Sequence, residues 1–433
     1  MKHARVDAEL PDELVYSILL NLPPKTLLRF RSVSKRWNDI ITSRAFAKHH
    51  CMNARSKPRA DHLLQFCKWC KDDQTLYYTK LNGHVSSSCG VPPSPVKFQL
   101  PPKLYEYSDQ TTKGGFWFGS SSCDGMLCTA TYEPDNTATI LVWNPFTRQF
   151  RRVPWPGVYT KFNTLLTSFV GFGYDHTSDD YKIVVHTYDF SASVFRTYVT
   201  ALRSSNSNVW RSIEELSMPW GKRSSRAVTL DNGDVYWVSW SSGPLSDNIS
   251  EEYYWKSCNP ILEQGRFLIL KFSFTDERLT VMPSPPKEHD LGKPMWNWQL
   301  REYEGSLYFY NYLDEFQAAA PTTHWAHIWT LIATPDNING GSKATWVKAM
   351  QVPFGALFRS YDWLLPLGFT VSGDLVMRIF NRLHTRTDDG DLMVYLAREC
   401  RFVVVHLKDD DEAGSKSVTY YHFLQTETLI SPN

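Results

Sequence analysis

The residues best suited to chemistry are a Cys-x-x-Cys pair, Cys67 and Cys70. Two thiolates at this spacing bind zinc when a second pair of ligands lies nearby, and Cys89 with His62 or His84 are the candidates. A redox role would need a strand–helix–strand context, which this stretch lacks. We therefore expect ordinary core or surface thiols here and not a metal or redox site.

Other catalytic patterns are equally poor. Tyr308, His324 and His327 are side-chain types that copper propeller enzymes use, but in strands they more commonly serve as core or rim residues. The sequence contains no HExxH, GxSxG or Walker pattern. Gly171–Gly173 lacks the third glycine of a dinucleotide loop, and residues 340–343 lack the first glycine of a phosphate loop. We expect no catalytic residue, metal or cofactor, and hence a protein that is not an enzyme.

Composition argues against two classes of partner. Lys and Arg total 46 against 45 Asp and Glu, a net charge of +1, so no overall charge draws the chain to nucleic acid or an anionic membrane. No run approaches the roughly 20 apolar residues that span a bilayer, and the charged N-terminus does not resemble a signal peptide. Eight scattered cysteines suit a reducing compartment. We expect a cytoplasmic or nuclear protein.

The elements that would position any site begin with about 50 residues of predicted helix. Apolar residues there recur at spacings of three and four, as on one helical face: Leu14, Ile18, Leu19 and Leu22. Pro23 and Pro24 end that helix and start a second, and Ser34 can cap a third. Helices this short need each other or a partner to be stable.

From about residue 61 the pattern predicts strands. Eight candidates stand out: 140–143, 181–186, 235–240, 267–272, 307–310, 328–332, 374–380 and 401–407. A glycine followed at once by a strand recurs at Gly125, Gly233, Gly305 and Gly373, each time opening a unit of three or four strands. Five units follow residue 116, and 61–100 can hold a sixth. This favours a β-propeller of about six blades over one large irregular β-sandwich.

The strongest motif covers residues 10–42. It opens with Leu10-Pro11-Asp12-Glu13, continues with spaced aliphatic residues, and closes with Val33-Ser34-Lys35-Arg36-Trp37. It resembles the F-box over nearly its full length, which implies three helices that pack on a Skp-type adaptor joined to cullin and RING subunits. Three short helices also carry more apolar side chains than they can bury among themselves. The predicted adaptor-binding residues are Leu10, Pro11, Ile18, Leu22, Leu27, Leu28, Val33 and Trp37.

Three segments of the β region are similar to the plant F-box-associated domain, which resembles kelch-type propellers: 123–128, 141–148 and 170–184. We interpret the residues of these segments as ones that shape the backbone and not as ones that bind a ligand. Asn144-Pro145 and Asp175 to Asp180 are turn chemistry, and Gly171 and Gly173 permit close backbone approach. Residues 418–423 are predicted to close the propeller as its terminal strand. The expected chain is thus an α+β multidomain protein, with an F-box at 6–50 and an F-box-associated β domain at 61–430.

These resemblances imply the substrate-recognition subunit of an SCF-type E3 ubiquitin ligase, with a protein as substrate. The alternative is a propeller lectin, or a small-molecule-binding or enzyme domain, with incidental N-terminal helices. Long connections at 241–260, 286–299, 311–326 and 353–365 are the expected substrate-binding loops. The candidate residues are Tyr254, Trp255, Trp296, Trp298, Trp325, Arg359, Tyr361 and Trp363. Such aromatics could equally fill the cores between blades.

Overall fold

A computed structural model describes the chain over most of its helices and strands. The described residues are 10–56, 61–69, 74–82, 96–99, 121–132, 138–156, 168–189, 194–203, 209–213, 223–224, 227–241, 266–283, 285, 299–312, 325–335, 342–353, 363–370, 372–380, 392–405, 422–425 and 428–432. No helix among them is long and apolar enough to cross a membrane.

Four helices begin the described chain: α1 (Asp12–Leu20), α2 (Pro24–Phe30), α3 (Lys35–Thr42) and α4 (Arg44–Ser56). As predicted, Pro24 opens α2, and the Ser34 hydroxyl caps α3 by accepting from the Trp37 N–H. We expected three helices ending near residue 50, whereas the structure has a fourth helix that ends at Ser56. The inward face of α4 carries few large apolar side chains, with Phe46 beside Ala47, His50 and Cys51, so its periodicity is weak.

The predicted apolar face of α1 mixes two neighbouring rows of the helix, about 100° apart around its axis. Val15 and Leu19 are buried against the core, whereas Leu14 and Ile18 point outward and are 51% and 50% exposed. Both pairs have a spacing of four residues, so each forms its own row along the helix. Spacing alone could not tell which row faces the core.

Twenty-five strands form six sheets, within the part of the chain described. Sheet 1 holds β25 (His422–Gln425), β1 (Asp61–Trp69), β2 (Gln74–Asn82) and β3 (Val96–Gln99) in that order. Sheet 2 holds β4 (Ser121–Cys123), β5 (Met126–Tyr132), β6 (Ala138–Asn144) and β7 (Gln149–Pro154). Sheet 3 holds β8 (Phe169–Asp175), β9 (Asp180–Asp189), β10 (Val194–Ala201) and β11 (Arg211–Ile213).

The remaining three sheets follow the same antiparallel plan. Sheet 4 holds β12 (Arg223–Ser224), β13 (Val228–Thr229), β14 (Val235–Ser241), β15 (Arg266–Ser273) and β16 (Arg278–Met282). Sheet 5 holds β17 (Gln299–Tyr303), β18 (Ser306–Tyr312), β19 (Trp325–Pro335) and β20 (Ser342–Pro353). Sheet 6 holds β21 (Trp363–Phe369), β22 (Leu375–Phe380), β23 (Leu392–Leu396) and β24 (Arg401–Val405). The eight predicted strands lie on β6, β9, β14, β15, β18, β19, β22 and β24, with 406–407 outside the described residues.

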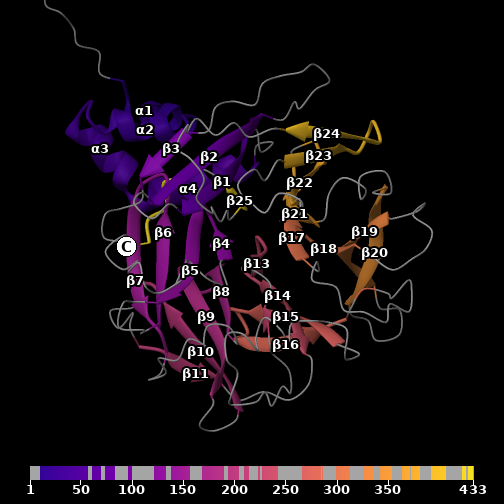
Figure 1. Ribbon diagram of the computed structural model, residues 1–433. Coiled ribbons are helices and arrows are strands. Elements are labelled where there is room, and N and C mark those ends of the chain that lie inside the picture. The colour runs from indigo at the N-terminus through magenta and orange to yellow at the C-terminus, as the bar shows by residue number, and fades with distance from the viewer. Residues whose placement is uncertain are drawn as a thin grey trace, which may run out of the picture.

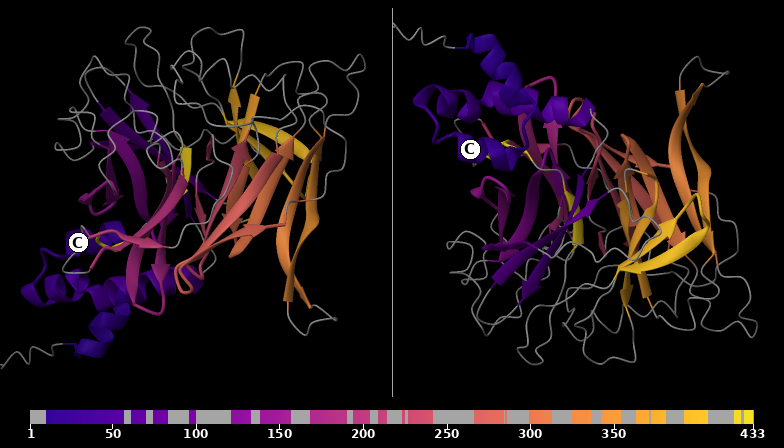
Figure 2. Two further views of the ribbon diagram at one scale, coloured as in Figure 1. Left: turned by 90° about the horizontal axis from the view of Figure 1, so that it is seen from below. Right: turned by 90° about the horizontal axis from the view of Figure 1, so that it is seen from above.

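The sheets follow one another in a propeller-like arrangement (Figures 1 and 2), with strands of successive sheets in contact from sheet 2 to sheet 6, and strands of sheets 6 and 1 in contact. β4 contacts β8, β14 contacts both β8 and β17, and β21 contacts β17 and β25. β25 comes from the C-terminal end of the chain and pairs with β1 near its start. The pairing runs from Phe66 opposite His422 to Leu63 opposite Gln425. The predicted closing strand therefore overlaps β25 at residues 422–423, while 418–421 lie outside the described residues.

The recurrent glycine marks the first hairpin of a sheet. Gly125, Gly233, Gly305 and Gly373 all have positive φ, and they lie in the turns that precede β5, β14, β18 and β22. At Asp124-Gly125 and Glu304-Gly305 both turn residues have positive φ, the conformation of a two-residue hairpin turn that matches strand twist. This local requirement explains why the repeat was visible in the sequence.

Gly171 and Gly173 on β8 are sites of close approach, as predicted. A Cβ on Gly171 would lie 2.5 Å from the Trp237 ring, and one on Gly173 would lie 2.8 Å from the Gly233 carbonyl oxygen. Sheets 3 and 4 therefore pack together at a spacing that no other residue type allows without a shift.

Candidate functional site

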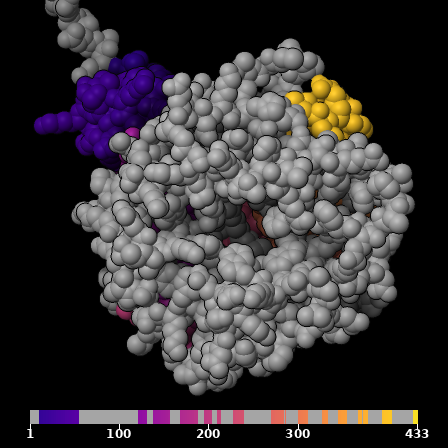
Figure 3. All heavy atoms as spheres, in the orientation of Figure 1, coloured from indigo at the N-terminus to yellow at the C-terminus, as the bar shows by residue number. Residues whose placement is uncertain are grey.

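The helices expose apolar side chains, as far as the described residues show. Leu10, Leu14, Ile18 and Val33 are between 50% and 58% exposed. An ion pair between Arg36 and Asp12 joins the starts of α3 and α1. The helices project from one corner of the molecule (Figure 3, indigo), where a partner can reach them. We call these four residues the apolar row.

The eight predicted adaptor-binding residues divide into three groups. Leu10, Pro11, Ile18 and Val33 are exposed; Leu22, Leu28 and Trp37 are half-buried and pack on the core. The structure does not place Leu27 on the predicted surface. Leu27 is fully buried in the core and offers no surface to a partner in this conformation. Leu14 is also exposed and was not among the eight, although its spacing of four from both Leu10 and Ile18 was available in the sequence.

One hydrophobic core fixes this surface to the β region. It joins Leu19 and Phe46 of the helices to Met126 of sheet 2, Phe172 of sheet 3 and Ile430 near the C-terminus, all at most 6% exposed. The helices are thus not a tethered module. The shared core therefore holds the apolar row in a fixed direction relative to the sheets. The predicted domain bounds, 6–50 and 61–430, did not include this connection.

The C-terminal segment 428–432, which we call the tail, is clamped between the helices and sheet 2. The buried Asn144 side-chain amide donates to the carbonyl oxygens of Thr428 at 3.1 Å and Ile430 at 2.8 Å. The Thr428 hydroxyl donates to the Asp124 carbonyl oxygen at 2.6 Å. The Asp124 carboxylate in turn accepts from the Tyr181 hydroxyl and the Cys51 thiol of α4.

A carboxylate from sheet 3 makes the polar half of the same junction. Asp179 accepts from Lys48 and Tyr174, and lies within ion-pair distance of Arg44 and Arg203. The hydrogen bond from Lys48 is the main reason that the pKa of Asp179 lies below its usual range. Arg44 and Arg203 also both donate to the Asp179 carbonyl oxygen, at 2.6 and 2.9 Å. We call this group the Asp179 cluster.

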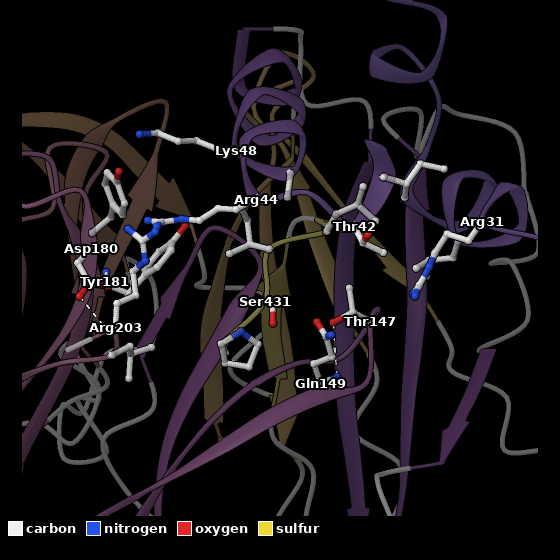
Figure 4. Close-up of a pocket in the computed structure, with 18 residues that line it drawn as sticks. Arg31, Thr42, Arg44, Lys48, Thr147, Gln149, Asp180, Tyr181, Arg203 and Ser431 are labelled. Atoms are coloured by element: carbon white, nitrogen blue, oxygen red, sulfur yellow. Dashed lines mark hydrogen bonds between the residues drawn. The ribbon is translucent and has the colours of Figure 1, made fainter. Parts of the chain in front are cut away.

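Beside the Asp179 cluster is a cavity of about 250 Å3 between the helices, sheets 2 and 3, and the tail (Figure 4). Arg44, Asp180 and Arg203 gather at one end, Arg31 and Gln149 lie at the other, and tail residues form part of the wall between them. Sequence reasoning did not find this cavity, because it is assembled from four separate stretches of the chain.

The predicted substrate-binding residues fall mainly outside the described structure. This applies to Tyr254, Trp255, Trp296, Trp298, Arg359 and Tyr361. Trp325 and Trp363 do have a described backbone, and they are the first residues of β19 and β21 and not members of loops. The connections at 311–326 and 353–365 are accordingly shorter than expected, because strands extend into both ends of each.

The candidate metal ligands are not brought together where the structure describes them. No group of three or more His, Cys, Asp or Glu side chains suited to a metal occurs among the described residues. Tyr308 on β18 packs against Phe369. His327 on β19 lies opposite Asn311, which is three residues after Tyr308 on β18. His324 and the side chains around Cys67 and Cys70 lie outside the described residues.

Comparison with known proteins gives two family matches. Residues 110–421 match the F-box associated beta propeller domain, and residues 8–49 match the F-box domain. An F-box protein of Arabidopsis thaliana is 31% identical over 59% of this chain and 62% of its own length. An F-box/kelch-repeat protein of the same plant is 25% identical over 54% of this chain, and the match covers 59% of that relative. The chain thus spans about three fifths of the length of these relatives.

Among solved structures, the beta-propeller domain of the Trilobed protease from Pyrococcus furiosus is similar, with a TM-score of 0.35 and 10% identity. The match covers 72% of this chain and 80% of that one. A likeness this distant carries no argument about function.

Proposed function

Because this chain is a plant F-box protein of the F-box-associated beta propeller family, we propose that it is the substrate-recognition subunit of an SCF-type E3 ubiquitin ligase. In this proposal the F-box binds a Skp-type adaptor, which connects it to cullin and RING subunits. The β region binds a protein substrate for ubiquitination. The chain itself contributes no catalytic group and needs no cofactor.

The observation that carries the proposal is the apolar row. The apolar row exposes large aliphatic side chains, while Val15, Leu19 and Leu27 from other faces of the helices pack in the core. Helices that served only as a cap on the β region would have no reason to keep such a surface apolar. Contiguous exposed apolar residues on a folded domain commonly mark a binding site.

A binding measurement with purified adaptor tests the proposal. Leu10→Ala combined with Pro11→Ala should weaken the Skp-type adaptor by roughly thirtyfold, as truncation of central interface anchors does. Both residues are exposed, so the melting temperature should not change. Substitution of the exposed Lys25 by Ala is the control and should leave affinity intact. Unchanged adaptor affinity in the double variant would refute the role of this surface.

For the β region, we propose that the six sheets are the blades of one propeller closed by β25 on β1. The pairing of β25 with β1 and the contacts between successive inner strands support this proposal. A closed ring has no exposed sheet edge at the joint between the chain ends, and so gives a rigid support for binding loops.

We propose that the aromatic residues Trp255, Trp298 and Trp363 belong to the substrate surface. Trp298→Ala and Trp363→Ala, made separately, should each reduce capture of a substrate found by proximity labelling with an F-box-deleted chain. A normal melting temperature is expected in each case. A collapsed melt would instead assign the residue to the core between blades, and full capture would place the substrate elsewhere.

We further propose that the protein acts in the cytoplasm or nucleus. Cys51, Cys123, Cys128 and Cys400 carry free thiols, which suits a reducing compartment. Fractionation of plant cells that express the tagged chain would test this placement.

A further inference from the structure

We propose that the cavity beside the Asp179 cluster is a binding site for a small organic anion, with an acidic group joined to an apolar body. The inference does not depend on the ubiquitin-ligase role, since it rests on the geometry of the junction between helices and sheets. None of the four residues of the apolar row lines the cavity, so a ligand there would leave the row free.

The charge of the walls favours an anion. Four basic side chains line the cavity, from Arg31, Arg44, Lys48 and Arg203, against one acidic side chain, from Asp180. The Asp180 carboxylate is occupied by the backbone N–H groups of Tyr181 at 2.7 Å and Arg203 at 3.1 Å. Even with the adjacent Asp179 counted, basic groups exceed acidic groups at this place by two. A cavity lined in this way raises the local concentration of anions.

The guanidinium of Arg44 shows where the acidic group would bind. Its Nη2 donates to the Asp179 carbonyl oxygen, but its Nη1 is shielded from solvent and has no hydrogen-bond partner among the described residues. A buried donor on a charged group is unfavourable without an acceptor. Because Nη1 is enclosed by the protein, a carboxylate or phosphate in the cavity would supply one when the Arg44 side chain turns toward it, with the charge-assisted geometry that guanidinium groups favour.

The rest of the wall suits an apolar body. Its apolar lining residues include Leu28, Ile41, Ala47, Leu202 and Leu429. Hydroxyl and amide groups at Thr42, Thr147 and Gln149 add a few fixed polar positions. The lining is divided about equally between polar and apolar side chains, which suits a ligand that has both an acidic group and an apolar body.

The size of the cavity limits the ligand. At about 250 Å3 it lies just below the usual range of ligand pockets, roughly 300–1,000 Å3. A nucleotide or a folded peptide segment is therefore too large, and a free metal ion would be repelled by the surplus of basic groups. A small aromatic or aliphatic acid fits both the volume and the charge.

Because the natural ligand is not identified, the test uses phenylacetate and phenyl phosphate as probes, with phenylacetamide as the neutral counterpart. Binding to the full-length chain is measured by saturation-transfer NMR and by the shift in melting temperature. We expect saturable binding of at least one anion, and no binding of phenylacetamide at the same concentration.

A matched pair of variants locates the site. Arg31 lines the cavity, and within the described residues its side chain donates to Asn38 alone, at 3.0 Å, so Arg31→Gln should leave the fold intact yet weaken the anion by about tenfold. Arg29→Gln removes the same charge from an exposed position two residues away that does not line the cavity, and should change nothing. Thr42→Phe, at an exposed position on the cavity wall, should block binding by filling the space.

Three outcomes would overturn the proposal. The first is that neither anion binds saturably at millimolar concentration. The second is equal binding of phenylacetamide, which would show that charge has no part. The third is equal weakening by Arg29→Gln and Arg31→Gln, which would indicate a general effect of surface charge and not a site.

Discussion

At the scale of single residues, leucines a few positions apart in the helices lie either in the core or on the surface. Leu14 is half-exposed on α1, whereas Leu19 on the same helix and Leu27 on α2 are fully buried. Aliphatic side chains in the core contribute to stability, and those on the surface are available to a partner. The two groups can be separated by measuring folding and binding in the same variants.

We predict opposite effects for Leu14→Ala and Leu27→Ala. Leu14→Ala should reduce adaptor affinity while changing stability by less than about 0.5 kcal/mol, because its side chain is already half-exposed. Leu27→Ala should cost about 2–5 kcal/mol of stability, because it leaves a cavity in the core. Chemical denaturation and adaptor titration on both variants measure these effects. Normal stability in the Leu27 variant would contradict its assignment to the core.

We predict that Gly171→Ala is destabilising by about 1–3 kcal/mol, the usual cost of overpacking. The new methyl group would lie within 3 Å of Trp237, Val235 and Val184, so sheets 3 and 4 would have to separate. Gly305→Ala is the comparison, since a Cβ there meets only Asp231 at 3.6 Å and its cost comes from positive φ alone. Urea denaturation of both variants, with the wild type, checks the difference.

At the scale of elements, α4 is the contact between the helices and the β region. Its Phe46 and Cys51 enter the shared core, while its Arg44 and Lys48 reach Asp179 at the end of the β8–β9 turn. The apolar contact does not depend on pH, but the ionic one does. The two contributions can therefore be distinguished by titration.

We predict that the Asp179 cluster stabilises the junction at neutral pH and stops doing so in acid. The pKa of Asp179 is lowered in the folded chain, chiefly by Lys48, so its contribution is present above its unfolded value near 4. That contribution is lost as pH falls through the lower, folded value. The melting temperature of Asp179→Asn should thus be below wild type at pH 7, with the gap closing below about pH 4. A gap independent of pH would show that the ion pairs contribute nothing.

At the scale of the whole molecule, the two ends of the chain meet twice. β25 completes sheet 1, and the tail then continues beneath the helices, where Asn144 holds it from a position 284 residues earlier. The first contact concerns closure of the β region, and the second concerns attachment of the helices. Truncations at different points separate them.

We predict two distinct results from truncation. Removal of residues 428–433 should leave the β region cooperative, but should loosen the helices, because Leu429 and Ile430 leave the shared core and Asn144 loses its acceptors. Removal from residue 418 onward should also expose the edge of β1 and give an aggregating protein. Hydrogen exchange at α4 and light scattering report the two effects. A monomer with an intact melt after the longer deletion would contradict closure.

The features that the sequence by itself determined are those set by neighbouring residues. The F-box motif, the Ser34 cap, the glycine hairpins and the close approach at Gly171 each depend on local backbone geometry or spacing, and each was predicted. Asn144 and Asp175 were likewise read as turn residues, and their side chains do accept from N–H groups two residues on.

Only the tertiary structure decided which surfaces those elements present. It determined that Val15 and not Leu14 faces the core, that Asn144 holds the tail with its other amide atom, and that Asp179 gathers basic groups from α4 and sheet 3. The contacts of Asn144 with the tail and of Asp179 with α4 join residues more than 100 positions apart, so no local pattern encodes them. They arise when burial of the shared core brings separate segments together, because burial depends on what each face meets and not on its own spacing.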